Sequence, residues 1–96
     1  MLLGVDKAQN VIIGDDISVA CSRTTAGWQT ANFNLPTYPT GYTFVGATVY
    51  TSSGYIHGVT VKGMPSSGGS MSLSYYNDTV SQNTVYVHVA PIFTRE

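Results

Sequence analysis

The side chains that could do chemistry are few and widely spaced in this sequence. The chain has two histidines, His57 and His88, one cysteine, Cys21, and one acidic pair, Asp15-Asp16. A zinc site takes about three or four ligands at defined spacing, and one chain offers two imidazoles even if their strands pair. A glycosidase needs two carboxylates that flank a cleft, whereas adjacent aspartates after a short apolar run are ordinary turn residues. We therefore expect no catalytic residue, no metal site and no cofactor.

Cys21 lies in the segment ISVACS, in phase with Ile17 and Val19. A nucleophilic cysteine needs an accessible site and a neighbour that lowers the pKa of the thiol. The local sequence supplies neither, so we expect Cys21 to be a small buried apolar group. With one cysteine, no intramolecular disulfide can form.

Aromatic side chains are better candidates for a binding site, because sugar rings stack on exposed aromatic faces and tyrosine adds a hydroxyl group. Trp28 stands where a loop meets an alternating segment, Tyr38 lies between two prolines, and Tyr55 follows a Ser-Ser-Gly turn. Tyr75 and Tyr76 are adjacent in a strand-like segment, so one points inward and the other outward. The sequence predicts ligand-binding positions at Trp28, Tyr38, Tyr55 and Tyr76.

The composition narrows the possible partners. Only 9% of the 96 residues are charged and the net charge is −1, against roughly 25% charged residues in an ordinary globular domain. The stretch 24–61 holds no charged residue, and Ser plus Thr number 22. Four Lys and Arg cannot form the basic stripe that neutralises phosphates or binds a membrane surface. No apolar run approaches the ~20 residues of a membrane-spanning helix. We expect no nucleic-acid partner and no membrane insertion.

The spacing of apolar residues predicts an all-β fold, a small antiparallel β-sandwich or flattened barrel of six to seven strands. No segment has a helical period, whereas short segments with a period of two alternate with Gly, Pro and Asn turns. The alternation places Ala31 and Phe33 inside in one strand, and Met71, Leu73 and Tyr75 inside in another. The expected strands are 10–13, 17–22, 28–35, 42–50, 55–62, 71–76 and 84–94.

The segment Tyr42–Tyr50, YTFVGATVY, is apolar on both of its faces. Such a strand is typical of the centre of a sheet whose second face meets another subunit or a ligand. We expect it to form a hairpin with Tyr55–Lys62, in which Tyr55, His57, Val59 and Val61 share one face. Pro91 is expected to end the last strand or to lie at an edge or bulge.

The chain divides into two parts by pattern. Residues 1–14 predict an N-terminal strand or the remnant of a preceding stalk, and residues 15–96 predict a single β-sandwich domain. The opening Met-Leu-Leu-Gly-Val is followed at once by Asp6 and lacks the basic start of a signal peptide. It is typical of a domain within a longer chain. A domain of this size is marginally stable alone, and oligomerisation is a common remedy.

Three segments carry a resemblance to a known class of proteins. They are Gly41-Tyr42-Thr43-Phe44-Val45-Gly46, Met71-Ser72-Leu73-Ser74-Tyr75-Tyr76-Asn77 and Val85-Tyr86-Val87-His88-Val89. In this order, separated by a polar turn and a Gly/Ser loop, they resemble the C-terminal β-domains of bacteriophage tail fibres and baseplate receptor-binding proteins. The resemblance covers residues 27–96 and transfers no specific sugar-binding residue.

The resemblance implies a homotrimeric, non-enzymatic tip of a tail fibre in the virion. Such a tip recognises a host cell-surface saccharide or caps the fibre. The alternative from the residues alone is a monomeric carbohydrate-binding or Ig-like accessory module of a bacterial surface protein. A neutral surface rich in hydroxyls and tyrosines fits both.

Overall fold

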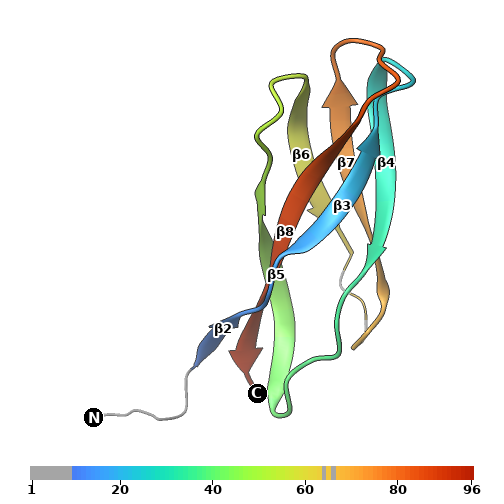
Figure 1. The fold of residues 1–96 in the computed structure, drawn as a ribbon. Helices are drawn as coiled ribbons and strands as arrows, with labels where there is room; N and C mark the ends of the chain where they lie inside the picture. The colour runs from blue at the N-terminus through green and yellow to red at the C-terminus, as the bar shows by residue number, and fades with distance from the viewer. Residues whose placement is uncertain (1–9, 64, 66) are drawn as a thin grey trace.

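The computed structural model describes residues 10–63, 65 and 67–96, which form two antiparallel β-sheets that face each other (Figure 1). The described residues contain seven strands and no helix, and the sheets do not close into a barrel. The predicted all-β fold is therefore confirmed, in its sandwich form.

The last strand organises the first sheet. Strand β8 (Thr84–Arg95) lies in the middle and pairs with β5 (Tyr42–Tyr50) along one side. Along its other side it pairs first with β3 (Ile17–Ser22) and then with the short β2 (Val11–Ile13). Residues 11–13 of the predicted 10–13 strand thus join the same sheet as the end of the chain.

The second sheet has the order β4-β7-β6. Strand β7 (Ser70–Asn77) is central, with β4 (Gly27–Asn34) on one side and β6 (Ile56–Lys62) on the other. Alternate residues of β4 and β7 face the core, and Leu73 and Tyr75 are almost fully buried. The predicted inward and outward faces of these two strands are confirmed.

The prediction that Tyr42–Tyr50 is a central strand is wrong. Strand β5 pairs only with β8 among the described residues, so it is an edge strand. A bulge between Phe44 and Gly46 leaves Phe44 buried and Val45 46% exposed. The sequence looks apolar on both faces because the bulge shifts the phase of the strand: Tyr42 and Phe44 before it and Ala47 after it all pack on the core.

The predicted hairpin between 42–50 and 55–62 is also wrong. Strand β6 pairs with β7 in the opposite sheet, so the connection after Tyr50 crosses from one sheet to the other (Figure 1). The prediction that Tyr55, His57, Val59 and Val61 share one face is wrong as well, because the register of β6 shifts between His57 and Thr60. The extra residue reverses the facing of the strand: His57 is exposed, whereas Val59 and Val61 pack against the core.

Pro91 lies inside β8 rather than at its end. In an antiparallel ladder, the N–H and C=O of one residue point to the same neighbouring strand. The Pro91 carbonyl accepts a hydrogen bond of 2.8 Å from Gly14 N, so the ring nitrogen also faces the gap between β2 and β3. No strand there requires the missing N–H, and the proline costs no ladder hydrogen bond.

The core lies between the sheets in two clusters. One is built around Tyr75, Val87 and Cys21, and the other around Phe44, Phe93 and Met71. Cys21 is fully buried and unpaired, as predicted. Burial raises the pKa of its thiol to about 11, so the sulfur is a protonated, apolar group at neutral pH.

Candidate functional site

The outer face of the β4-β7-β6 sheet carries a row of ring side chains. Trp28 pairs with Tyr76 across β4 and β7, and Tyr76 pairs with His57 across β7 and β6. All three side chains are exposed. Because directly paired residues project from the same face of a sheet, the register brings the three rings into one line across it.

Trp28 is held in place on this surface. Its ring and that of Tyr76 are 5.5 Å apart at an interplanar angle of 79°, an edge-to-face contact. The far edge of the indole reaches β6, where a Cβ at Gly58 would lie 2.9 Å from Cη2 of Trp28. Gly58 has a φ of +62° at the β6 bulge. The bulge and the missing side chain together leave room for the indole, which remains 64% exposed.

His57 ends the row with a polar contact. Its Nε2 lies 2.6 Å from Oδ2 of Asp78, and the two side chains are 54% and 44% exposed. An exposed pair of this kind contributes little to stability. It does fix the orientation of the imidazole, and it leaves Asp78 oxygens available as hydrogen-bond acceptors beside the rings.

Below the rings, the same face continues with small polar groups. The next row across the sheet is Thr30, Ser74 and Thr60, and the one after it is Asn32, Ser72 and Lys62. These side chains are exposed or partly exposed. The face therefore carries an aromatic row next to exposed hydroxyl and amide groups, with one positive charge, Lys62, at its edge.

A buried polar cluster that no sequence pattern predicts supports the Asn77 end of β7. The Asn77 amide accepts a hydrogen bond from Arg23 Nε at 3.2 Å and donates to the carbonyls of Arg23 and Thr25 at 3.0 Å each. Arg23 Nη2 donates to the Thr79 carbonyl at 2.9 Å. Asn77 is fully buried and Arg23 only 5% exposed. The two residues are 54 positions apart, so no local pattern marks them.

The four predicted ligand-binding residues have different environments. Trp28 and Tyr76 are brought together in the row. Tyr55 is exposed in the connection between β5 and β6 and lies over the Arg23 guanidinium at 4.1 Å. Tyr38 is half-buried, with its ring 5.4 Å from that of Phe93 and its hydroxyl donating to the Pro65 carbonyl. It packs on the second core cluster, away from the row.

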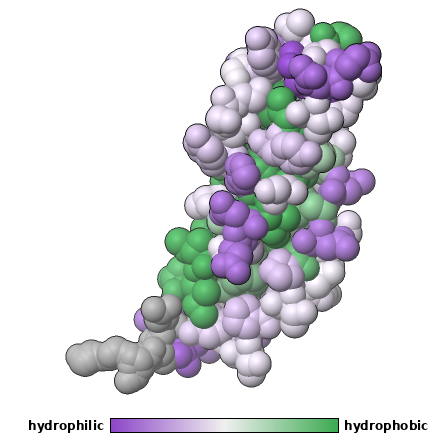
Figure 2. All heavy atoms as spheres, viewed as in Figure 1, coloured by the Kyte–Doolittle hydropathy of each residue, from purple (hydrophilic) through white to green (hydrophobic). Residues whose placement is uncertain are grey.

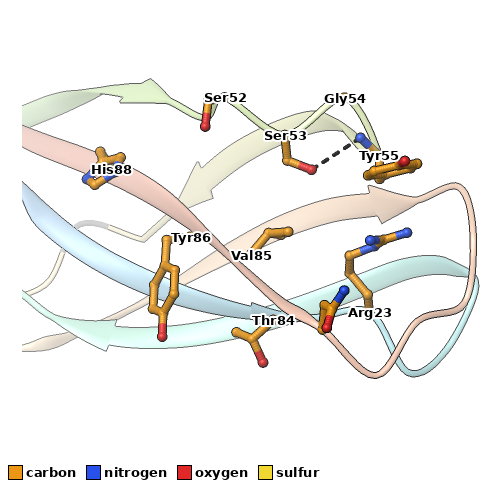
Figure 3. A pocket seen from close by; sticks show the side chains of 10 residues that line it. Arg23, Ser52, Ser53, Gly54, Tyr55, Thr84, Val85, Tyr86 and His88 are labelled. Carbon is orange, nitrogen blue, oxygen red and sulfur yellow. Dashed lines mark hydrogen bonds between the residues drawn. The ribbon is translucent and has the colours of Figure 1, made fainter.

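Two hollows lie on the lateral sides of the sandwich. One of about 700 Å³ opens between the β5–β6 connection and the first half of β8, and Figure 3 shows Arg23 and Tyr55 at one end of it. The other, of about 410 Å³, runs between the edge strands β5 and β6 and is lined by Val45, Val49 and Val59 among other apolar residues. We call these the polar cavity and the apolar groove.

The histidines do not lie on paired strands. His57 is on β6 and His88 on β8, in opposite sheets. Across residues 10–63, 65 and 67–96, no group of three or more His, Cys, Asp or Glu is gathered as metal ligands. The same residues include no helix that could cross a membrane.

Comparison of this chain with protein-family models, with curated proteins and with solved structures finds no match.

Proposed function

We propose that this domain is a non-enzymatic adhesion module that binds a neutral saccharide on the outer face of the β4-β7-β6 sheet. The observation that carries the proposal is the row formed by Trp28, Tyr76 and His57. An indole that is ordered by its neighbours and still 64% exposed has no role in the core. A fixed, exposed aromatic ring is the kind of group that contributes most to recognition at a surface.

The chemistry of the face fits a sugar. A pyranose has an apolar C–H face that packs on an aromatic ring, and hydroxyls that exchange hydrogen bonds with Asp78, Thr30 and Asn32. The face is three strands wide, which suits several units of an extended glycan chain. Its groups are neutral except for Lys62 and the exposed His57–Asp78 pair.

We further propose that the domain is the homotrimeric tip of a phage tail fibre or baseplate protein in the virion. The resemblance of the three segments named above supports this setting. The apolar groove between β5 and β6 supports an assembly, because an uncharged open edge is a ready surface for another chain. Figure 2 adds an apolar patch at the β2 end, where Val11 and Ile13 are exposed. The alternative is a monomeric accessory module of a bacterial surface protein.

Binding is tested with a glycan array on the purified domain, followed by calorimetry on the best neutral glycan. Removing one stacked ring costs roughly 1–3 kcal/mol where such rings have been replaced by alanine at stacking platforms, so Trp28→Ala is expected to weaken binding by a factor of about 5 to 150. Tyr50→Ala is the matched control, because Tyr50 is equally exposed, at 65%, but belongs to the other sheet. Unchanged affinity in Trp28→Ala overturns the proposed site.

The assembly is tested separately by light scattering at micromolar concentration. A mass of three chains supports the fibre tip. A strictly monomeric species overturns it and favours the single-copy module, while the saccharide site on the β4-β7-β6 face is unaffected by that result.

A further inference from the structure

We infer that the polar cavity is a second saccharide subsite, which takes a sugar that carries a carboxylate, such as a uronic acid. This inference rests on the proposed saccharide-binding function and narrows its ligand class to glycans that contain an acidic unit. Four observations lead to it: the shape of the cavity, the charge of Arg23, the open edge of β8 and the position of Tyr55.

The cavity has the size and lining of a small-molecule site. Its volume of about 700 Å³ falls within the roughly 300–1,000 Å³ typical of such sites. Ser52, Ser53, Asn83 and Thr84 line it with polar groups, and Tyr55, Tyr86 and His88 line it with rings. Figure 3 shows these groups arranged on both sides of the first half of β8.

Arg23 brings a buried positive charge to one end of the cavity. Its guanidinium bonds to Asn77 and Thr79 and lies against the Tyr55 ring, but every one of these partners is neutral. In the part of the chain that the structure describes, Asp78 is paired with His57, and no carboxylate forms an ion pair with Arg23. A buried cation is costly without an anion beside it. A ligand carboxylate would supply that anion, and guanidinium groups bind carboxylates through paired hydrogen bonds.

The edge of β8 adds backbone groups to the same cavity. The ladder between β5 and β8 ends at the pair Tyr50 and His88. The Thr51 hydroxyl then donates to the Tyr86 carbonyl at 3.1 Å, so the backbone groups of Tyr86 face the cavity side. With no strand beside it there, the Tyr86 N–H is positioned to donate to a ligand, as is that of Thr84 two residues earlier.

This edge suits a sugar better than an added peptide strand. An added strand needs several free donors and acceptors in alternation, but the free edge covers only 84–87, and the Thr51 hydroxyl already occupies the Tyr86 carbonyl. A sugar needs a few convergent hydrogen bonds and a ring to pack on, which the hydroxyls and Tyr55 provide.

The cavity also adjoins the aromatic row. Tyr55 is the residue just before β6, and His57 is the second residue of that strand. The Tyr55 carbonyl accepts a hydrogen bond of 2.9 Å from the Asp78 N–H. Asp78 in turn contacts His57, the last ring of the row. One glycan chain can therefore continue from the aromatic row to the cavity around the β6 edge.

The test is a titration of the ¹⁵N-labelled domain with glucuronate, glucose and acetate at equal ionic strength, followed by NMR. Glucuronate is expected to shift the amide signals of Thr84 and Tyr86 and the Nε–H signal of Arg23, at concentrations at least tenfold lower than glucose or acetate require. Equal effects of glucose, or no shifts at these groups, overturn the inference. So does a stronger effect from an uncharged, end-blocked tetrapeptide, which would indicate strand addition instead.

Because Arg23 also holds the fold together, the matched variants are placed at Ser52, which is exposed at the cavity rim. Both variants lose the Ser52 hydroxyl, so they are compared with each other: Ser52→Glu, which adds a negative charge near the site, is expected to bind glucuronate about fivefold more weakly than Ser52→Gln, of similar shape. Equal affinities of the two variants overturn the inference. The indole N–H signal of Trp28 reports the aromatic row independently, so a failure of the cavity and a failure of the proposed function give different results.

Discussion

The indole of Trp28 packs on the backbone of Gly58, two strands away across the sheet, so closely that a Cβ at Gly58 would lie 2.9 Å from the ring. The contact links the exposed ring to the bulge in β6, since Gly58 is also the residue with positive φ there. One glycine thus sets both the facing of β6 and the position of the ring proposed to bind a sugar.

Gly58→Ala is expected to move the indole and to weaken saccharide binding by a factor comparable to Trp28→Ala. The left-handed backbone adds a cost of roughly 1–2 kcal/mol to folding for any residue other than glycine. Intrinsic tryptophan fluorescence reports the displacement, because Trp28 is the one tryptophan of the chain, and urea unfolding reports the stability.

Gly54→Ala is the control for this substitution, because no atom lies within 4 Å of a Cβ built there. It is expected to leave both the fluorescence spectrum and the unfolding midpoint close to those of the unchanged protein. Identical spectra for Gly58→Ala and Gly54→Ala would contradict the packing of Trp28 on Gly58.

Asn77→Ala is expected to destabilise the domain by about 2–4 kcal/mol. The change leaves Arg23 Nε and the Thr25 carbonyl without the partner that the amide supplied, whereas the Arg23 carbonyl keeps its hydrogen bond from the Ser81 N–H. Each unsatisfied buried group costs about 1–3 kcal/mol. Urea unfolding measures the loss. Asn32→Ala, on the exposed face of β4, removes the same amide from solvent-facing surface and should change the free energy of unfolding by less than about 0.5 kcal/mol. A similar loss in both variants would contradict the role of the buried cluster.

The stability of the domain is expected to fall as the pH rises above about 9. Burial raises the pKa of Cys21 from 9.0 to about 11 and also raises that of Tyr75. Below pH 9 the thiol is protonated in both the folded and the unfolded chain, so its contribution is complete. Between pH 9 and 11 the unfolded chain loses the proton and the folded chain keeps it, which lowers the free energy of unfolding by about 1.4 kcal/mol per pH unit.

Urea unfolding at pH 7 to 10.5 measures this slope. The variant Cys21→Ala removes the thiol and should show a shallower fall, with the remainder due to Tyr75, although its stability at pH 7 is lower. A slope that is unchanged in Cys21→Ala would rule out the thiol as its cause.

The local sequence pattern was sufficient to predict which residues face the core in strands that have one apolar and one polar face. In β4 and β7 the buried positions recur every second residue, so the phase was sufficient to predict that Tyr76 faces outward; the structure places Trp28 on the same exposed face. The same reasoning failed in β6, because one extra residue at Gly58 reverses the phase; a glycine inside a strand is the signal that could have shown it.

Which strands pair with each other could not be predicted from the local sequence pattern. An apolar segment such as Tyr42–Tyr50 has the same sequence pattern whether it lies at the centre of a sheet or at an edge that borders an open groove. The connection that follows it does not indicate which sheet the chain enters next. The prolines on either side of Tyr38 likewise predict an exposed turn, yet the Tyr38 ring packs on Phe93, 55 positions later. Contacts between distant residues decide each of these features.

Val45→Asp is expected to separate the proposed trimer into single chains without unfolding them. Val45 is 46% exposed at the bulge of an edge strand and lines the apolar groove, so the folded monomer can accept a carboxylate there at a cost of about 0.5 kcal/mol or less. Around a threefold axis the substitution places three like charges in an apolar contact, where each would lose its hydration. Val80→Asp is the control, because Val80 is comparably exposed, at 55%, in the turn after β7, and it should keep the assembly. Light scattering distinguishes the two variants, and a Val45→Asp protein that retains the mass of three chains would show that the groove is not the contact between them.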